Sequence, residues 1–359
     1  MDIGELRKLL AAGMAIPAHP LALTAARKLD ERHQRCLTRY YLDAGAGGIA
    51  GGVHTTQFAI RSPQHDLYRT VLALAAEEMT AFEKRERRRV VKIAGAIGPT
   101  AQAVKEAETA ARLGYDAVLL SLGWARGKTV EELAAHCRQV SKVLPLFGFY
   151  LQQAAGGIPL NAAFWRLFLE IENVAGIKVA PFNRYQTIDV ARALAESGRH
   201  EEVVLYTGND DSIVADLLTP YRYPVGGRTV EVRYRGGLLG HWAVGTRAAV
   251  QMLERIKAIA RTGAPVPLEL LGIAAEVTDA NAAFFDAANG FAGCIAGINE
   301  VLARQGLMQG RWCLDPAEDL SRGQAEEIDR VSRSYPWLSD DAFVRENRSQ
   351  WLAESREVS

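Results

Sequence analysis

The sequence predicts an α/β fold, a single (β/α)₈ TIM barrel with a helical extension at its C-terminal end. From about residue 14 to 240, short apolar runs alternate with longer amphipathic runs, which is typical of repeated βα units with a parallel sheet. The chain has 359 residues, and barrels of this kind often exceed about 250 residues as one unit. No GxGxxG or GxxxxGK(S/T) turn follows an early strand, which argues against an open doubly wound sheet.

Eight short apolar runs are the candidate barrel strands. In chain order they are residues 14–18, 47–53, 90–97, 116–122, 146–151, 174–179, 203–207 and 232–239. Helical patterns lie between them, such as 101–113, where alanine and valine recur at three- and four-residue spacing beside charged residues. Eight strands alternating with helices predict a closed barrel.

An insertion and an extension complete the predicted layout. Within residues 221–234, two glycines stand between runs rich in Tyr, Val, Thr and Arg, which predicts a β-hairpin on one rim of the barrel. We expect residues 1–258 to form the barrel and 259–359 to form a helical extension packed on it. The last ten or so residues are rich in Arg, Glu and Ser and are expected to fray.

The composition favours a small-molecule partner over nucleic acid or a membrane. Lys plus Arg and Asp plus Glu both number 42, so no net field attracts a polyanion. Pro17, His19 and Pro20 interrupt the only apolar N-terminal stretch, so we expect a cytoplasmic protein without a signal peptide. The four cysteines form no CxxC pair and are expected to be buried thiols: Cys36, Cys137, Cys294 and Cys313.

Lys178 is the most informative residue, because active sites of such barrels lie at the C-terminal ends of the strands. It stands within the apolar run 174–180, which should be buried on both faces. Burial lowers the pKa of a lysine toward the range in which its free amine is a nucleophile. The alternative is a structural lysine whose amine reaches solvent from the strand end.

Tyr150 lies 28 residues before Lys178, about one βα unit, at the end of the preceding strand. The two side chains are therefore expected to be neighbours. A tyrosine beside an amine that becomes a carbinolamine and then an iminium can move the required protons. The alternative is a core aromatic residue whose hydroxyl bonds to backbone.

Strand two ends in the sequence GGVHTTQ over residues 51–57. Its glycines permit close backbone approach, while Thr55 and Thr56 offer hydroxyl and N–H groups to a carboxylate. With the TGND sequence at 207–210, Tyr150 and the GIK sequence ending at Lys178, these motifs occur in the order of one family.

Over roughly residues 10–310, the chain resembles the dihydrodipicolinate synthase and N-acetylneuraminate lyase superfamily of class I, pyruvate-type aldolases. Ala18-His19-Pro20 resembles the threonine-proline end of that family's first strand. The resemblance implies the same barrel with a helical extension and a Schiff base on Lys178. It also implies that Tyr150 relays protons and that catalytic Thr55, with Thr56, binds the carboxylate.

Departures from the family pattern argue against an authentic dihydrodipicolinate synthase. His54 replaces a glycine before the threonine pair, and Gln57 and Phe58 follow where the family has glycine and glutamate. Trp124 lies where the synthases have a relay tyrosine donated by a neighbouring subunit. Ala155 replaces the arginine that holds the second substrate's carboxylate. We therefore expect a less anionic, apolar or aromatic second substrate.

The resulting expectation is a Schiff-base lyase or aldolase acting on a 2-keto acid, and on an aldehyde as a second partner. We expect no cofactor and no metal ion, and a homo-oligomer, either a dimer or a tetramer. Phe58, Trp124 and Trp242 are expected to form an apolar surface beside the site. The candidate substrate-binding residues besides Thr56 are His54, Gly208, Asn209, Leu239, Trp124 and His241.

Two alternatives stay open. His19, His54 and His241 follow strands that adjoin in a closed barrel, with Asp210 one strand further, so the chain could be a metal-dependent hydrolase. Against this, the first strand has no His-x-His, and Tyr150 and Lys178 occupy strand ends where histidine ligands would be needed. The second alternative is a barrel without catalysis that has a binding or regulatory role.

Overall fold

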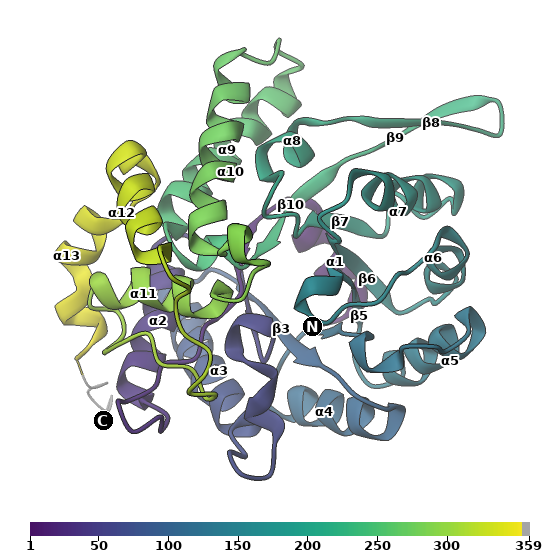
Figure 1. Ribbon diagram of the computed structural model, residues 1–359. Helices are drawn as coiled ribbons and strands as arrows, with labels where there is room; N and C mark the ends of the chain where they lie inside the picture. Colours follow the sequence, from purple (N-terminus) through teal and green to yellow (C-terminus); the bar gives the residue numbers. More distant parts are fainter. Residues whose placement is uncertain (354–359) are drawn as a thin grey trace.

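Eight parallel strands form the barrel in the computed structural model, which describes residues 1–353 (Figure 1). They are hydrogen-bonded in the order β1-β10-β7-β6-β5-β4-β3-β2. The ring closes between β1 and β2, where the His19 N–H donates to the Ala50 carbonyl over 2.8 Å. The predicted fold class and all eight predicted strands are confirmed: β1 Ala15–Pro17, β2 Gly48–Gly51, β3 Val91–Ala96, β4 Ala117–Leu120, β5 Leu146–Leu151, β6 Val174–Ala180, β7 Val204–Thr207 and β10 Tyr234–Leu239.

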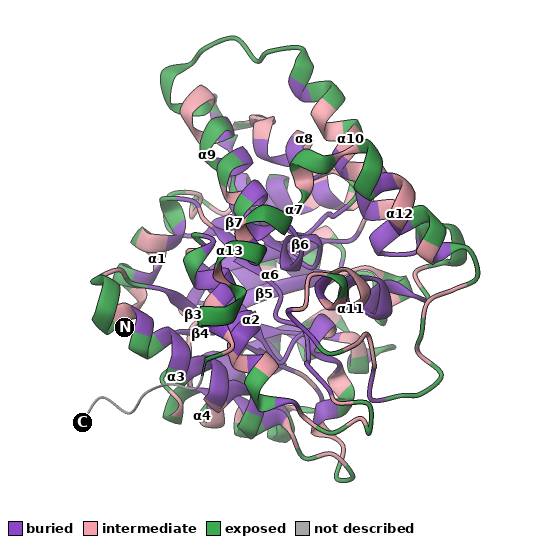
Figure 2. Ribbon diagram, turned by 90° about the vertical axis from the view of Figure 1, so that its left-hand side faces the viewer, coloured by how far each residue is buried: buried purple, intermediate pink, exposed green. Residues whose placement is uncertain are grey.

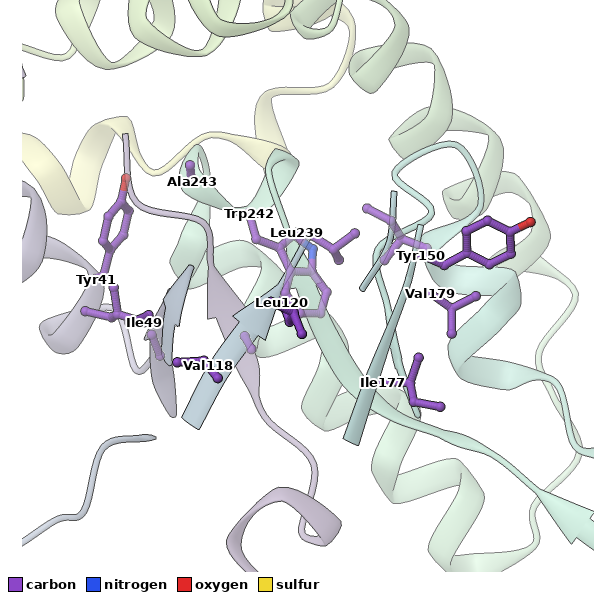
Figure 3. Close-up of a cluster of buried hydrophobic side chains, with 14 of the residues drawn as sticks. Tyr41, Ile49, Val118, Leu120, Tyr150, Ile177, Val179, Leu239, Trp242 and Ala243 are labelled. Carbon is purple, nitrogen blue, oxygen red and sulfur yellow. The ribbon is translucent and has the colours of Figure 1, made fainter. Parts of the chain in front are cut away.

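Helices surround the strands and divide the apolar core into two layers. Side chains alternate along each strand, so one set points into the barrel and the other points toward the helices. Figure 3 shows part of the outer layer, which includes Tyr150, Ile177 and Val179. Phe149 and Ala180 belong to the inner layer. The surrounding helices are α2 Glu31–Asp43, α3 Tyr68–Glu86, α4 Thr100–Arg112, α5 Val130–Ser141, α6 Ala162–Leu169, α7 Arg184–Glu196, α8 Ile213–Leu218 and α9 Thr246–Thr262.

An N-terminal helix that we did not predict, α1 Ile3–Ala11, packs against β6, β7 and β10. Leu6 and Leu10 are fully buried in the inner layer. The Tyr206 hydroxyl donates to the Leu10 carbonyl over 2.8 Å, and Arg7 donates to the carbonyl of Val174, the first residue of β6, over 2.9 Å. These contacts place α1 at the N-terminal ends of the strands, so a ligand must enter at the opposite end.

The predicted hairpin is present as β8 Tyr221–Val225 and β9 Arg228–Val232. Gly226 and Gly227 both have positive φ, which is the backbone conformation that a tight two-residue hairpin turn requires. The hairpin packs on α7, and Figure 1 shows it as a long arm beside that helix.

The C-terminal segment is helical, with α10 Glu269–Phe284, α11 Cys294–Arg304, α12 Gln324–Ser334 and α13 Asp341–Trp351. Figure 2 shows the strands buried at the centre and the extension helices with exposed outer sides. The helix α13 packs on α2, where the Trp351 indole donates to Asp43 over 2.6 Å. The boundary that we expected between the barrel and the extension, at 258/259, falls inside α9 and stays a prediction. Of the tail that we expected to fray, residues 354–359 lie outside the described residues.

The four cysteines are free and buried, as predicted. Within residues 1–353, no helix combines the length and the apolar character needed to span a membrane.

Candidate active site

A cavity of about 70 Å³ lies at the C-terminal ends of the strands, beneath the extension. It is small beside the roughly 300–1,000 Å³ pockets that hold drug-sized ligands. Strand ends and loops of the barrel supply most of the lining, and the extension supplies the rest. The lining includes His54, Thr55, Phe149, Gln152, Ala154, Ala155, Lys178, Ala180, Phe182, Gly208, Asp210, Phe285, Phe291 and Cys294.

Lys178 lies on β6 with its side chain in this cavity, and only 7% of the residue is exposed. Its amine lies over the Phe149 ring, 4.6 Å from the ring centroid. Burial lowers the pKa of Lys178, while the negative charge of Asp210 acts in the opposite direction. The free amine is therefore far more abundant near neutral pH than it is in an ordinary lysine.

Gly208, which follows β7, provides the space that Lys178 occupies. A Cβ atom at this position would lie 2.6 Å from Lys178 Cε and 2.7 Å from the Ala180 Cβ. The Gly208 N–H donates to the Val179 carbonyl over 2.8 Å, so its backbone is fixed against β6. The absence of a side chain here lets the lysine extend into the cavity. Of the predicted substrate-binding residues, Gly208 thus lies beside the amine.

Tyr150 points away from Lys178, which corrects the expectation that the two side chains are neighbours. Phe149, not Tyr150, is paired with Lys178 across β5 and β6, while Tyr150 is paired with Val179. The Tyr150 ring packs on Trp165 in the outer layer, with centroids 5.5 Å apart. Its hydroxyl accepts a hydrogen bond from the Leu160 N–H over 3.1 Å. The phenol is therefore on the wrong face of the strand for a direct relay.

Asp210 is a cavity residue that our candidate catalytic and binding residues did not include. It is 4% exposed, and its Oδ1 accepts the His241 N–H over 2.8 Å. Burial raises the pKa of Asp210, and the charge of Lys178 opposes that rise. A buried acid beside a buried lysine, both with pKa values shifted toward neutrality, is a common property of functional sites. The TGND sequence contained the signal, but it suggested Asp210 only as a possible metal ligand.

The residues after β2 form a short 3₁₀ turn, η1 His54–Thr56. His54 and Thr55 line the cavity, and burial together with the charge of Lys178 lowers the pKa of His54 to about 4. Thr56 is fully buried, and its hydroxyl donates to the His19 carbonyl over 2.7 Å. The Thr55 hydroxyl also donates to the His19 carbonyl, but over 3.4 Å, and of the two threonines only Thr55 lines the cavity.

Gln57, where the family has glycine, adopts a φ of 65°, a left-handed value that favours glycine. Its side-chain oxygen accepts the Leu314 N–H over 2.7 Å. This bond ties the strand-two loop to the extension.

Two other predicted binding residues, Asn209 and Leu239, have structural surroundings. The Asn209 amide donates to Thr187 and Asp216 and accepts the Phe182 N–H, so its polar atoms have structural partners. Leu239 packs in the outer layer, as Figure 3 shows. These two side chains do not line the described cavity, which corrects their assignment.

His241 and Trp124 also lie away from the cavity lining. The His241 ring packs against Phe284 with centroids 5.5 Å apart, and only its backbone reaches Asp210. Trp124 is 38% exposed and packs on His136, so it lies at the surface.

Association into dimers or tetramers stays a prediction.

The apolar wall of the cavity differs from the one we predicted. Trp242 is buried in the outer layer, and Phe58 packs against His54 without lining the cavity. The aromatic part of the wall instead comes from four phenylalanines, two of them from the extension: Phe149, Phe182, Phe285 and Phe291.

The three histidines of the metal hypothesis do not gather. The His19 ring is held by Pro20, Thr38 and Gln34, each within 2.9 Å. His54 lines the cavity, whereas the His241 ring faces Phe284. In the part of the chain that the structure describes, no group of three or more His, Cys, Asp or Glu side chains could hold a metal ion.

Comparisons with known proteins bear on the fold and on one segment of the sequence. No protein-family model matches the chain. A segment of 117 residues is 26% identical to the 4-hydroxy-tetrahydrodipicolinate synthases of two Thermoanaerobacter strains, one of them T. pseudethanolicus. This match covers 32% of the chain and only 38% of the length of either relative.

Solved structures match over far more of the chain. Dihydrodipicolinate synthase from Oceanobacillus iheyensis is 17% identical, with a TM-score of 0.72 over 93% of this chain and 99% of that one. N-acetylneuraminate lyase from Fusobacterium nucleatum is 16% identical, with a TM-score of 0.69 over 90% of this chain and 99% of that one. The chain has the fold of the dihydrodipicolinate synthase and N-acetylneuraminate lyase superfamily.

Against the superfamily pattern, the cavity shows two departures. Phe149 stands beside Lys178 in the place expected for the strand-five tyrosine. Ala155 lies at the cavity where the synthases have an arginine. Among the described lining residues, Lys178 is the only lysine or arginine.

Proposed function

We propose that the protein is a Schiff-base-forming lyase or aldolase that acts on a small 2-keto acid of the pyruvate type. The observation that carries the proposal is a buried lysine with a lowered pKa, facing a small cavity at the catalytic end of a (β/α)₈ barrel. The superfamily fold supports the same chemistry.

In the proposed reaction, the neutral amine of Lys178 attacks the keto carbon. Loss of water gives an iminium, which accepts the electron pair released when a bond at the adjacent carbon breaks. The reverse direction forms that bond. Thr55 lines the cavity, and its hydroxyl, which donates to the His19 carbonyl over 3.4 Å, can turn to bind the substrate carboxylate. The cavity of about 70 Å³ favours a keto acid of few carbons.

Trapping the iminium tests this proposal. The protein is incubated with pyruvate and borohydride, and its intact mass is measured. We expect a gain of one reduced pyruvate per chain, and no gain in Lys178→Ala. An unmodified wild-type protein would contradict the proposal and favour a barrel with a binding role.

We further propose that the second substrate is an apolar or aromatic aldehyde rather than aspartate semialdehyde. A carboxylate in a partly desolvated pocket needs a cation, and Ala155 supplies none. The four phenylalanines that line the cavity offer faces for apolar or stacking contact instead. The protein is then not a dihydrodipicolinate synthase, despite the names of its curated relatives.

Comparative kinetics tests the second substrate. We expect kcat/KM with pyruvate and benzaldehyde to exceed that with pyruvate and aspartate semialdehyde. Ala155→Arg should raise the rate with the semialdehyde, and Gln153→Arg, which adds the same charge outside the cavity lining, serves as the matched control. A wild-type preference for the semialdehyde would overturn this assignment.

A further inference from the structure

The family resemblance assigns proton transfer to a phenol, but among the described residues that line the cavity there is no tyrosine, and Phe149 is the residue paired with Lys178. Imine formation and cleavage still require protons to move at three points. We propose that Asp210 carries these protons in place of the tyrosine. This proposal rests on the proposed function.

The position of Asp210 suits the task. It follows β7, lines the same cavity as Lys178, and interacts electrostatically with that lysine. The His241 N–H fixes its Oδ1, and apart from its own backbone N–H no other donor in the described part of the chain is bonded to this carboxylate. One oxygen is thus anchored while the other can exchange a proton with a ligand in the cavity.

A proton can pass between the buried side chains of Lys178 and Asp210 without changing their combined charge. A charged pair of ammonium and carboxylate has the same net charge as a neutral pair of amine and carboxylic acid. Burial disfavours the charged forms of both groups, since it lowers the pKa of Lys178 and raises that of Asp210. Moving one proton from Lys178 to Asp210 therefore creates the nucleophile and an acid together.

Asp210 gives or takes one proton in each of three steps. The amine attacks the keto carbon and forms a carbinolamine. Asp210 then donates a proton to the carbinolamine hydroxyl, which departs as water and leaves the iminium. The carboxylate of Asp210 then removes a proton from the adjacent carbon, and the C–H electron pair forms the enamine. When the enamine carbon attacks an aldehyde, Asp210 returns the proton to the new alkoxide, and the iminium forms again.

The other titratable groups facing this region are less suited. The pKa of His54 is lowered to about 4, so its imidazole is a weak base. Burial raises the pKa of Cys294 well above its usual value, which leaves a thiol that is neither a useful acid nor a base. The His241 ring packs on Phe284, and Asp211 is exposed. Asp210 combines a place in the cavity lining with a pKa that burial raises toward neutrality.

Asp210→Asn tests the proposal, because it keeps the side-chain size and an oxygen for the His241 N–H. Two readouts use pyruvate: the end point of borohydride trapping, and exchange of the methyl protons with deuterium followed by NMR. Asp211→Asn, one residue later, removes the same charge outside the cavity lining and is the matched control.

We expect Asp210→Asn to reach full trapping, since removing its charge further lowers the pKa of Lys178. Methyl exchange should fall about 100-fold or more, the usual contribution of a positioned base. Asp210→Glu should recover part of the exchange, and Asp211→Asn should match wild type. The exchange rates of the wild type and of Asp211→Asn should fall as pH drops below the pKa of Asp210, whereas the residual rate of Asp210→Asn should lack this dependence.

Wild-type exchange in Asp210→Asn would overturn the proposal. Loss of both trapping and exchange in Asp210→Asn, without recovery in Asp210→Glu, would assign Asp210 a structural role and also overturn it. If the wild-type protein neither traps nor exchanges pyruvate, the proposed function fails instead. The three outcomes are distinct.

Discussion

The two faces of the β5–β6 strand pair are both buried, but they differ in their surroundings. On the inner face, the amine of Lys178 lies over the ring of Phe149 in a small cavity. On the outer face, Tyr150 and Val179 pack against the helices, and the phenol hydroxyl is satisfied by the Leu160 N–H. Burial alone therefore does not identify a functional residue. The face of the strand determines whether a buried side chain borders the cavity or packs against the helices.

The position of the Lys178 side chain on the inner face depends on Gly208. Apart from replacing the lysine itself, we expect the largest loss of imine-forming rate from a substitution at Gly208. In Gly208→Ala, the new methyl group would overlap Lys178 Cε and displace the amine. A misplacement of this scale lowers reactivity about 100-fold. The rate of imine trapping at fixed pyruvate measures it.

Gly272→Ala provides the control, because Gly272 lies in α10, its φ is not positive, and an added Cβ atom would meet no neighbouring group within 4 Å. It should trap pyruvate at the wild-type rate and be slightly more stable, by up to about 1 kcal/mol. Equal rates in the two alanine variants would break the assignment of the inner face.

The pH dependence of trapping separates Lys178 from an ordinary lysine. Attack needs the free amine, so the rate rises with pH and levels off once the amine is deprotonated. Because the pKa of Lys178 is lowered from 10.5 to about 8, the plateau should begin near pH 8. Below it, the rate should fall about tenfold per pH unit. A rate measured with cyanoborohydride that still climbs through pH 10 would contradict the lowered pKa.

The outer face should respond least. Tyr150→Phe removes only the bond to the Leu160 N–H, so we expect a change in rate of less than about threefold and a loss of about 1 kcal/mol in the free energy of unfolding. The sequence alone predicts that the same substitution slows turnover about 100-fold, as for a positioned acid. Steady-state kinetics and thermal unfolding decide between the two.

The strand pattern was predictable because apolar runs and helical periodicity repeat in each βα unit, and Lys178 was found because a charge in such a run is conspicuous. The side on which Tyr150 points was not predictable. Side chains alternate along a strand, so an error of one residue in aligning β5 with β6 exchanges the two faces. The spacing of 28 residues runs through a loop and a helix, and it does not fix that register.

The remaining cavity wall was hidden for a different reason. Phe285, Phe291 and Cys294 come from the extension, more than 100 residues after Lys178, and no local pattern connects them to the barrel. Asp210 was visible in the TGND sequence, but only the structure shows its burial beside the lysine.

Peptide mapping of the borohydride-reduced pyruvate adduct tests the central claim most directly. Lys92 is an internal control, since it is also a buried strand lysine but is paired with Glu83 over 2.6 Å. We predict that the peptide containing Lys178 carries the whole modification and that the Lys92 peptide carries none. An adduct on any other lysine, or no adduct with saturating pyruvate, would contradict the account.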